Sequence, residues 1–313
     1  MNLNSENEIL VSICCLTYNH APYIRQCLDG FMMQKTTFQF EVLIHDDAST
    51  DGTTNIIREY ESKYPSQIKP IYEDHNQWVL GRKGSAIFNF PRAQGKYIAM
   101  CEGDDYWTDP YKLQKQVDFL ESHPDYTLCF HNAIEHWEKG ENEDSLFVKG
   151  VTNSRDYTGY EILEIWTIPT ASVVFKKSVI DSDLYQKAVR EPRFLFGDIV
   201  LFLTNAEFGK LHYINETMSV YRRQENGMVF TFNYDHQKKM PDHYQAIISI
   251  FGEKYTRILS PKFFSYLYFR LCLESKQRKF YKWSISYFVQ SFFKSPSGFY
   301  LAFKQYLKLK FFK

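Results

Sequence analysis

Residues 42–53 read VLIHDDASTDGT, an apolar run that ends in small polar and acidic residues. The apolar part, together with Phe40 and Glu41, is short and rich in branched side chains, which is typical of a buried strand. Beyond the polar residues, Ile56, Ile57 and Tyr60 recur at helical spacing. This part of the chain therefore predicts a strand, a polar turn and a helix, in that order.

The same unit recurs on both sides of this segment. Apolar residues follow one helical stripe from Ile24 to Met32, and Asp109 with Pro110 is typical of a helix start. The expected strands of this half are residues 11–16, 40–44, 68–72 and 97–101. Strands that alternate with helices predict a mostly parallel sheet flanked by helices, and chemistry gathers at the carboxyl ends of such strands.

The second half of the chain is less regular. We expect strands at 126–130, 172–175 and 211–221, a helix at 198–206, and mainly helices from residue 242 onward. The expected domains are 1–235, with halves 9–135 and 136–235, and a helical region 236–313.

Composition excludes several classes of protein. The chain has 313 residues, of which 37 are basic, 37 are acidic and 44% are hydrophobic, so it is neither disordered, collagen-like nor a small disulfide scaffold. The balanced charge gives no reason to expect nucleic acid as a partner.

The six cysteines include no C-x-x-C pair and are expected to be reduced core residues. The sequence shows no signal-peptide pattern, so a cytoplasmic location is the default expectation.

The charge is unevenly distributed along the chain. Residues 275–313 hold nine lysines and arginines and no acid, so the first 274 residues hold 28 basic and 37 acidic side chains. The same segment is dense in Phe, Tyr and Trp, a composition typical of helices that lie on anionic lipid. Aromatic residues at helical spacing also pack as core. Residues 276–313 are thus expected to contact an anionic membrane surface or to pack inside the fold.

Three groups of acids stand beside the predicted elements: Asp46 with Asp47, Glu102 with Asp104 and Asp105, and Asp198 at a helix start. Two carboxylates about 4 Å apart repel by roughly 4 kcal/mol at an effective dielectric constant near 20. A hard divalent cation with oxygen ligands compensates such repulsion. Taken singly, these acids could also be turn or helix-capping residues.

Three segments together resemble the family 2 glycosyltransferases, which have the GT-A fold. They are VSICCLTYN at 11–19, VLIHDDASTDGT at 42–53 and YIAMCEGDDYW at 97–107. The resemblance is specific over residues 9–135 and looser from there to about residue 225. It implies a GT-A, Rossmann-like sheet that binds a nucleotide-diphosphate sugar.

The resemblance also implies roles for single residues. Thr17, Asn19, Asp46 and Asp104 are expected to bind the nucleotide sugar. Asp105, Asp104 and Glu102 are expected to hold Mg²⁺ or Mn²⁺, which would stabilise the departing diphosphate.

Asp198 resembles the general base of enzymes that invert the anomeric configuration. We expect the dipole of the helix to keep this carboxylate ionised and to make it a weaker base.

Some positions depart from the family pattern. Gln224 stands near a place where related chains often carry His, and Glu102 stands where Asp is more usual. Arg222 and Arg223 either reach the diphosphate or are solvated at a strand end.

The sequence thus predicts a metal-dependent inverting glycosyltransferase, with a UDP-sugar as the first choice of donor. The acceptor would be a saccharide or lipid-linked saccharide of a cell-surface polysaccharide or glycolipid, at the inner face of the cell membrane. One alternative is a membrane-tethered nucleotide-sugar-binding protein or an inactive transferase partner. A sugar nucleotidyltransferase or a dehydrogenase is disfavoured because no glycine-rich phosphate loop follows the first strand.

Overall fold

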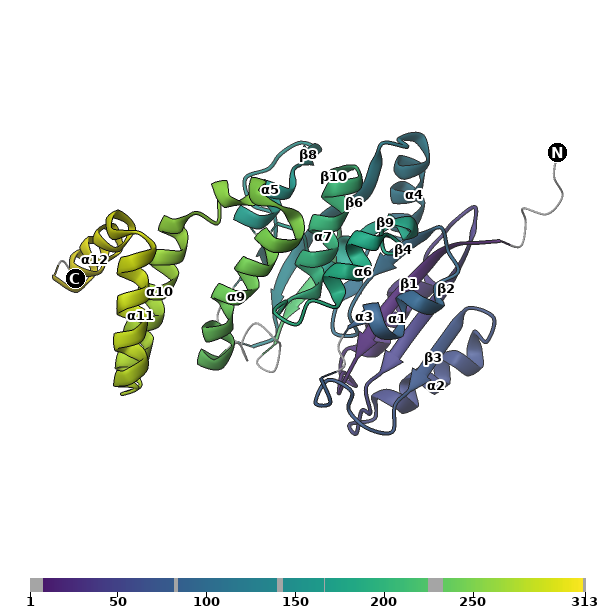
Figure 1. Cartoon of the computed structure of the whole chain (residues 1–313). Helices are drawn as coiled ribbons and strands as arrows, with labels where there is room; N and C mark the ends of the chain where they lie inside the picture. The colour runs from purple at the N-terminus through teal and green to yellow at the C-terminus, as the bar shows by residue number, and fades with distance from the viewer. Residues whose placement is uncertain (1–7, 82–83, 140–142, 166, 225–232, 312–313) are drawn as a thin grey trace. The chain divides into compact units, whose positions relative to one another are not determined.

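The computed structural model describes residues 8–81, 84–139, 143–165, 167–224 and 233–311 (Figure 1). The chain forms two compact units. Unit 1 consists of Met1–Gln186 and Gly197–Glu225, and unit 2 consists of Lys187–Phe196 and Asn226–Lys313. The short segment Lys187–Phe196 therefore belongs with the helical end of the chain rather than with the segments that flank it.

Unit 1 is built on a ten-stranded sheet in which the order of the main path is β3-β2-β1-β4-β9-β6-β10-β5. Two short strands extend it, since β7 pairs with β6 and β8 pairs with β10. The strands are β1 (Ile9–Thr17), β2 (Gln39–Asp46), β3 (Ile68–Tyr72), β4 (Tyr97–Met100), β5 (Tyr106–Trp107), β6 (Tyr126–Trp137), β7 (Ser145–Leu146), β8 (Arg155–Tyr157), β9 (Val174–Lys176) and β10 (Lys210–Arg223).

The first four strands of the path are parallel, as the repeated strand and helix unit predicts. β1 lies between β2 and β4, and the register places Thr17 opposite Asp46 (Figure 1). Apolar side chains of these strands, such as Val11, Ile13 and Ile44, are completely buried. Because the strands are parallel, the loops after β1, β2 and β4 leave the same edge of the sheet.

The other half of the sheet is mixed. β9 runs antiparallel to both β4 and β6, whereas β10 runs parallel to β6 over almost its full length. The strand expected at 172–175 begins at Val174, because Ser172 lies in a 3-10 turn. β5 pairs antiparallel with β10, so the segment after β4 is also fastened to the last strand of the unit.

Helices pack on this sheet through the faces that the apolar spacing predicts. α1 (Ile24–Met32), α2 (Thr53–Lys63) and α4 (Lys112–Ser122) contribute to one hydrophobic core with β1, β2 and β4. α4 begins at Lys112, later than expected, since the Asp109 carboxylate accepts the Tyr111 N–H at 2.7 Å before the helix starts. Other helices of unit 1 are α3 (Ser85–Phe88), α5 (Gly159–Glu164) and α7 (Gly197–Phe208), whereas α6 (Asp183–Val189) begins in unit 1 and ends in unit 2.

The cysteines are interior residues: five lie in unit 1, and Cys272 lies in unit 2. All six are free and buried, which confirms the expectation from their spacing. Burial raises the pKa of the Cys101 thiol to about 11, so it is protonated at neutral pH.

Unit 2 is helical, and the α-helices that begin within its described residues 233–311 are α9 (Tyr234–Phe251), α10 (Pro261–Gln277), α11 (Tyr281–Lys294) and α12 (Pro296–Phe311). α9 begins eight residues before the expected position at 242, after Asn233, whose side chain accepts the N–H groups of Asp235 and His236. Ser295 is the only residue between α11 and α12, at the break that Pro296 predicts. Among the residues that the structure describes, no helix is long and apolar enough to cross a membrane.

Candidate functional site

The candidate site lies at the edge where β1, β2 and β4 end. Thr17 and Asp46 are the last residues of their strands, and the Asp47 N–H donates to the Thr17 carbonyl at 3.0 Å. The Gly103 N–H, in the loop after β4, donates to the Leu16 carbonyl at 2.9 Å. Three loops that the sequence singled out are therefore tied to one another by backbone hydrogen bonds.

Asn19 fastens the loop after β1 to the loop after β2. Its N–H donates to the Ser49 hydroxyl at 2.9 Å, and its side-chain oxygen accepts the Thr50 N–H at 2.8 Å. Asn19 has a φ of 54°, a left-handed conformation that Asn tolerates better than most residues. The contacts show a structural role for Asn19 in shaping the loop; binding of the nucleotide by this residue stays a prediction.

Asp46 is almost completely buried and holds its own loop. One carboxylate oxygen accepts the Ser49 N–H at 3.3 Å, and the other accepts the Thr54 hydroxyl at 2.5 Å. Each carboxylate oxygen has two lone pairs, so capacity for a further donor remains. A contact from Asp46 to the base or ribose stays a prediction, because these hydrogen bonds alone would explain an acid at this position.

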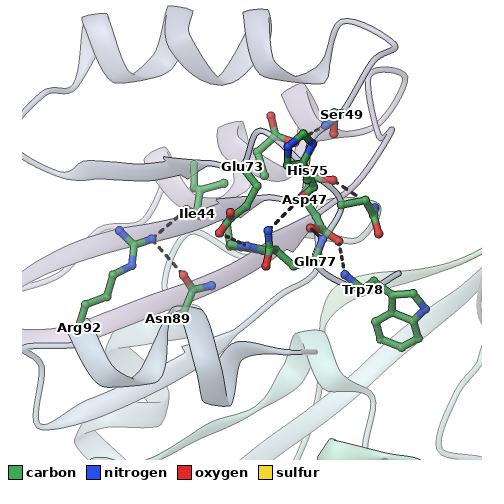
Figure 2. A network of polar contacts seen from close by, with 12 residues as sticks. Ile44, Asp47, Ser49, Glu73, His75, Gln77, Trp78, Asn89 and Arg92 are labelled. Carbon is green, nitrogen blue, oxygen red and sulfur yellow. Dashed lines mark hydrogen bonds and ion pairs between the residues drawn. The ribbon is translucent and has the colours of Figure 1, made fainter. Parts of the chain in front are cut away.

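Asp47 has a role that the sequence did not reveal. Its carboxylate accepts the N–H of Gln77 at 2.5 Å and the N–H of Trp78 at 3.2 Å, and its carbonyl accepts the Asn76 side chain at 3.2 Å. Figure 2 shows Asp47 facing Gln77 and Trp78 in this network. Asp47 thereby anchors the loop after β3 to the end of β2 and holds the partly exposed Trp78 beside the candidate site.

The acidic loop after β4 approaches the loop after β1 so closely that glycine is required at one position. A Cβ atom on Gly103 would lie 2.7 Å from the Thr17 hydroxyl oxygen and 3.0 Å from Nδ1 of His20. Both of these atoms are buried and have no hydrogen-bond partner in the structure. The loops after β1 and β4 therefore pack so closely here that these two polar atoms are covered without a partner.

Asp104 is held by two side chains from other elements. Its Oδ2 accepts a hydrogen bond from Nε2 of Gln224 at 2.6 Å and lies 3.9 Å from Nε2 of His20. Gln224 directly follows β10 and stands near the place where related chains often carry His. Its side-chain amide therefore helps to position the acidic loop.

Asp105 points into the protein. Its side chain is 2% exposed, and its Oδ1 accepts the backbone N–H of Arg222 at 2.8 Å. Burial and repulsion by Asp104 raise the pKa of the Asp105 carboxyl well above its usual range. Asp105 therefore joins the acidic loop to β10, and its role as a metal ligand stays a prediction.

The two arginines at the end of β10 are occupied by other residues. Arg222 pairs with Glu138, contacts Gln26 and lies over the rings of Tyr23 and Tyr106. Arg223 pairs with Glu135, with 2.5 Å between Nη2 and Oε1. Both side chains are mostly buried, so free solvation does not describe them, and contact with a diphosphate stays a prediction.

Glu102 connects the acidic loop with Asp198. The pKa of Glu102 is raised because protein surrounds the carboxyl and because Asp104 and Asp198 repel its charge. The side chain nevertheless reaches water, which moderates the shift. Asp198 is therefore among the charges that act on the loop after β4, and the expectation that this carboxylate and the loop share one site stays a prediction.

Asp198 lies in the first turn of α7, and its Oδ1 accepts the Ile199 N–H at 2.9 Å. Burial raises its pKa to about 6, although the backbone N–H groups act in the opposite direction. The expectation that the helix terminus makes Asp198 a weaker base is therefore wrong, because desolvation outweighs the dipole. At neutral pH the carboxylate is still mostly ionised, and it is a stronger base than an exposed Asp.

No self-contained metal centre is present within residues 8–81, 84–139, 143–165, 167–224 and 233–311, where no three His, Cys, Asp or Glu side chains are grouped to hold an ion. Mg²⁺ bound with nucleotides commonly uses one or two carboxylates together with phosphate oxygens. Asp104 and the water-accessible Glu102 offer such a pair, and their mutual repulsion would fall when a cation binds. The residues present therefore fit a cation that arrives with a diphosphate.

Two further residues of the region were missed by sequence reasoning. His20 was not weighed because it stands in the polar stop after the first strand, and the sequence gave no hint of Asp104 across the loop. Gly103 was read as part of a motif, whereas its lack of a side chain is what permits the close contact with Thr17. For Asp47, the sequence offered one indication of a special role, namely that it forms an acidic pair with Asp46 at the end of a predicted strand.

Comparison with known proteins agrees with this geometry. The sequence model of the family described as Glycosyl transferase family 2 matches residues 12–224. The uncharacterized protein Rv1520 of Mycobacterium tuberculosis is 39% identical over 228 residues, which cover 73% of this chain and 63% of that protein. The chain thus spans about three fifths of the length of this relative.

A more distant relative has a named reaction. It is the UDP-Glc:alpha-D-GlcNAc-diphosphoundecaprenol beta-1,3-glucosyltransferase WfaP of Escherichia coli, 33% identical over 113 residues, or 36% of this chain and 42% of that protein.

Two solved structures share the fold. TarS of Staphylococcus aureus in complex with UDP-GlcNAc superposes with a TM-score of 0.57 at 16% identity, covering 84% of this chain and 71% of that one. The mannosyltransferase PcManGT of Pyrobaculum calidifontis, in complex with GDP-Man and Mn²⁺, gives a TM-score of 0.51 at 15% identity and covers 96% of this chain and 81% of that one. From the match over residues 12–224 and this shared GT-A fold, the chain belongs to glycosyl transferase family 2.

Proposed function

We propose that the protein is an inverting glycosyltransferase that moves a sugar from a nucleotide-diphosphate sugar to a hydroxyl group of a saccharide. One observation carries this proposal. Asp198, a half-buried carboxylate in the first turn of α7, is one of the charges that raise the pKa of Glu102, as Asp104 is. This interaction supports the assignment of Asp198 and the loop after β4, far apart in the sequence but both in unit 1, to one site.

Asp198 would accept the proton of the acceptor hydroxyl while that oxygen attacks the anomeric carbon of the donor. The new carbon–oxygen bond forms on the face opposite the diphosphate, and the bond to the diphosphate breaks. The departing nucleoside diphosphate keeps the electron pair of that bond. A pKa of about 6 suits this role, because the group is ionised at neutral pH yet basic enough to take a proton.

The acidic loop would serve the donor. Gln224 and His20 position Asp104, and the bond from Asp105 to the Arg222 N–H keeps the loop against β10. Mg²⁺ or Mn²⁺ would be held by Asp104 with Glu102 or Asp105, and when bound with the diphosphate it stabilises the charge of the leaving group. The Mn²⁺ in PcManGT supports this assignment.

A UDP-sugar is the proposed donor, and a saccharide or lipid-linked saccharide of the cell surface is the proposed acceptor, reached at the inner face of the cell membrane. The UDP-GlcNAc bound by TarS and the reaction in the name of WfaP support both assignments. A thermal-shift screen of UDP- and GDP-sugars, with and without Mn²⁺, would identify the donor, because a ligand that binds only the folded state raises Tm.

The test of the proposal is Asp198→Asn. We expect the rate of sugar transfer to fall by about 10²–10⁴-fold, the typical contribution of a general base, while the Kd for the donor stays unchanged. Transfer is followed by the nucleoside diphosphate released in the presence of acceptor, and binding by calorimetry. Asp183→Asn is the matched control, since Asp183 is also an acid in the first turn of a helix and is exposed.

Two outcomes would contradict the proposal. Loss of donor binding together with transfer in Asp198→Asn would show that Asp198 is structural. Donor binding by the unaltered protein without any nucleoside diphosphate release, with every donor and with metal added, would favour the nucleotide-sugar-binding protein instead.

A further inference from the structure

The packing of α10 against α11 is unusual because small polar side chains fill it. Ser265 and Ser291 are completely buried, and Cys272 and Ser284 are nearly so. The Ser265 hydroxyl donates to the Ser291 carbonyl at 2.7 Å, and the Ser291 hydroxyl donates to the Ser265 carbonyl, also at 2.7 Å. Seven residues separate Ser284 from Ser291 and Ser265 from Cys272, so these groups lie on one stripe of each helix.

The large side chains of α11 and α12 lie mainly on the outside. Phe293 is 79% exposed and Ile285 67%, whereas Tyr287 and Ala302 are among the few apolar residues of these helices that are buried. The exposed large residues of the two helices are Tyr281, Trp283, Ile285, Phe288, Val289, Phe292, Phe293, Tyr300, Leu301, Phe303 and Leu309. A surface helix of a globular protein shows the reverse pattern, with apolar residues inside and polar residues outside.

Lysines share this outer surface. Lys282, Lys294, Lys304, Lys308 and Lys310 are exposed on α11 and α12, and the sequence from 275 to 313 contains no acid. We call the exposed apolar residues and these lysines the outer face. Two copies of such a face would repel each other by their like charges, so a second copy of the chain is a poor partner. An anionic surface that also accepts apolar side chains complements both properties.

We propose that the outer face of α11 and α12 inserts into the interfacial layer of an anionic membrane. Helices packed in lipid use small side chains and hydroxyl hydrogen bonds between helices and turn large side chains toward the lipid, as α10 and α11 do. The lysines can extend their apolar stems along the lipid and place their charges among the headgroups. None of the described helices crosses a membrane, so the helices lie within the interface rather than span the bilayer.

The proposal is tested by co-sedimentation with vesicles of phosphatidylcholine that contain one third phosphatidylglycerol. The triple variant Phe293→Gln, Leu301→Gln, Leu309→Gln should lower the partition coefficient at least about tenfold, because it removes three exposed apolar side chains from the outer face. Pure phosphatidylcholine vesicles, or high salt, should weaken binding of the unaltered protein by about fivefold for each lysine at the surface. Brominated lipid should quench the fluorescence of Trp283, and Trp283→Phe gives the baseline.

A matched control comes from unit 1. Leu146→Gln, Ile165→Gln, Phe208→Gln replaces three apolar side chains that are similarly exposed but lie outside the outer face. Partition should be unchanged in this control, and circular dichroism should show that both triple variants are folded.

Three results would overturn the proposal: equal loss of partition in the two triple variants, no loss in the outer-face variant, or a stable dimer that this variant dissociates. The last result would assign the face to a second copy of the chain. The measurement reports lipid binding alone, so it succeeds or fails independently of the transferase proposal.

Discussion

Unit 1 and the last helices of unit 2, α10 to α12, differ in where they place small polar and large apolar side chains. In unit 1, Ile13, Leu28 and Phe31 are completely buried, and the acids gather where strands end. In unit 2, Ser265 and Ser291 are completely buried while Phe293 is exposed. One principle, the burial of apolar groups away from water, explains both arrangements if the surface of unit 1 contacts water and the surface of α11 and α12 contacts lipid. Water excludes apolar side chains from the surface of unit 1, whereas lipid would accept those of unit 2.

The largest difference between the units should appear when one phenylalanine is removed from each. Phe31 is completely buried and packs edge to face on Trp107, with 4.8 Å between ring centroids. Phe31→Ala should lower the free energy of unfolding by about 3–5 kcal/mol because it leaves a cavity. Phe293→Ala should change it by less than about 0.5 kcal/mol. Urea unfolding followed by circular dichroism measures both, and a large effect of Phe293→Ala would break the comparison.

A substitution inside unit 2 tests whether small side chains are required there. Ser291→Leu adds a net two heavy atoms where Ser291 is completely buried between α10 and α11, and it should cost about 1–3 kcal/mol through overpacking. Ser249→Leu makes the same change at an exposed position of α9 and should be nearly neutral. Equal midpoints of urea unfolding for the two variants would show that the interior of unit 2 is loosely packed.

The smallest effect concerns pH and His243, which lies in unit 2. His243 is 2% exposed, and its Nδ1 accepts the Leu195 N–H at 3.3 Å. Burial lowers its pKa from 6.5 to about 4. Between pH 6.5 and pH 4, His243 binds a proton in the unfolded chain but not in the folded unit. The free energy of unfolding therefore falls as the pH falls through this range.

The loss should be about 1 kcal/mol between pH 6.5 and pH 5.5, given 1.36 kcal/mol for each unit of pKa difference. His243→Gln should remove this part of the pH dependence in urea unfolding curves. An unchanged slope in the variant would mean that folding does not shift the pKa of His243.

Much of unit 1 could be predicted from the sequence because its signals are local. The strands that carry 11–16, 40–44 and 68–72 form as expected, and the acids that follow strands do meet at one edge. Parallel pairing explains why these acids meet, since the carboxyl ends of all strands in such a sheet lie at the same edge. Confirmation of the family by the match over residues 12–224 rests on these same segments.

What the sequence could not predict depends on partners that are distant along the chain. β9 runs antiparallel to its neighbours β4 and β6. The residues of β9 alone do not indicate this direction. The raised pKa of Asp198 comes from burial, which a helix start alone does not reveal. Serine is polar, so the sequence alone gives no reason to expect the serines of α10 and α11 in the interior. The structure shows that they are buried between the packed helices.

The late position of β10 in the sequence has a consequence for how the protein is made. β10 is the parallel neighbour of β6 and also pairs with β5 and β8, and its Arg222 N–H is the partner of Asp105. On the ribosome, at about 5–20 residues per second, β6 therefore waits several seconds for the strand that covers its edge. Exposed strand edges invite wrong pairing, so this interval is when the nascent chain is most in need of a chaperone.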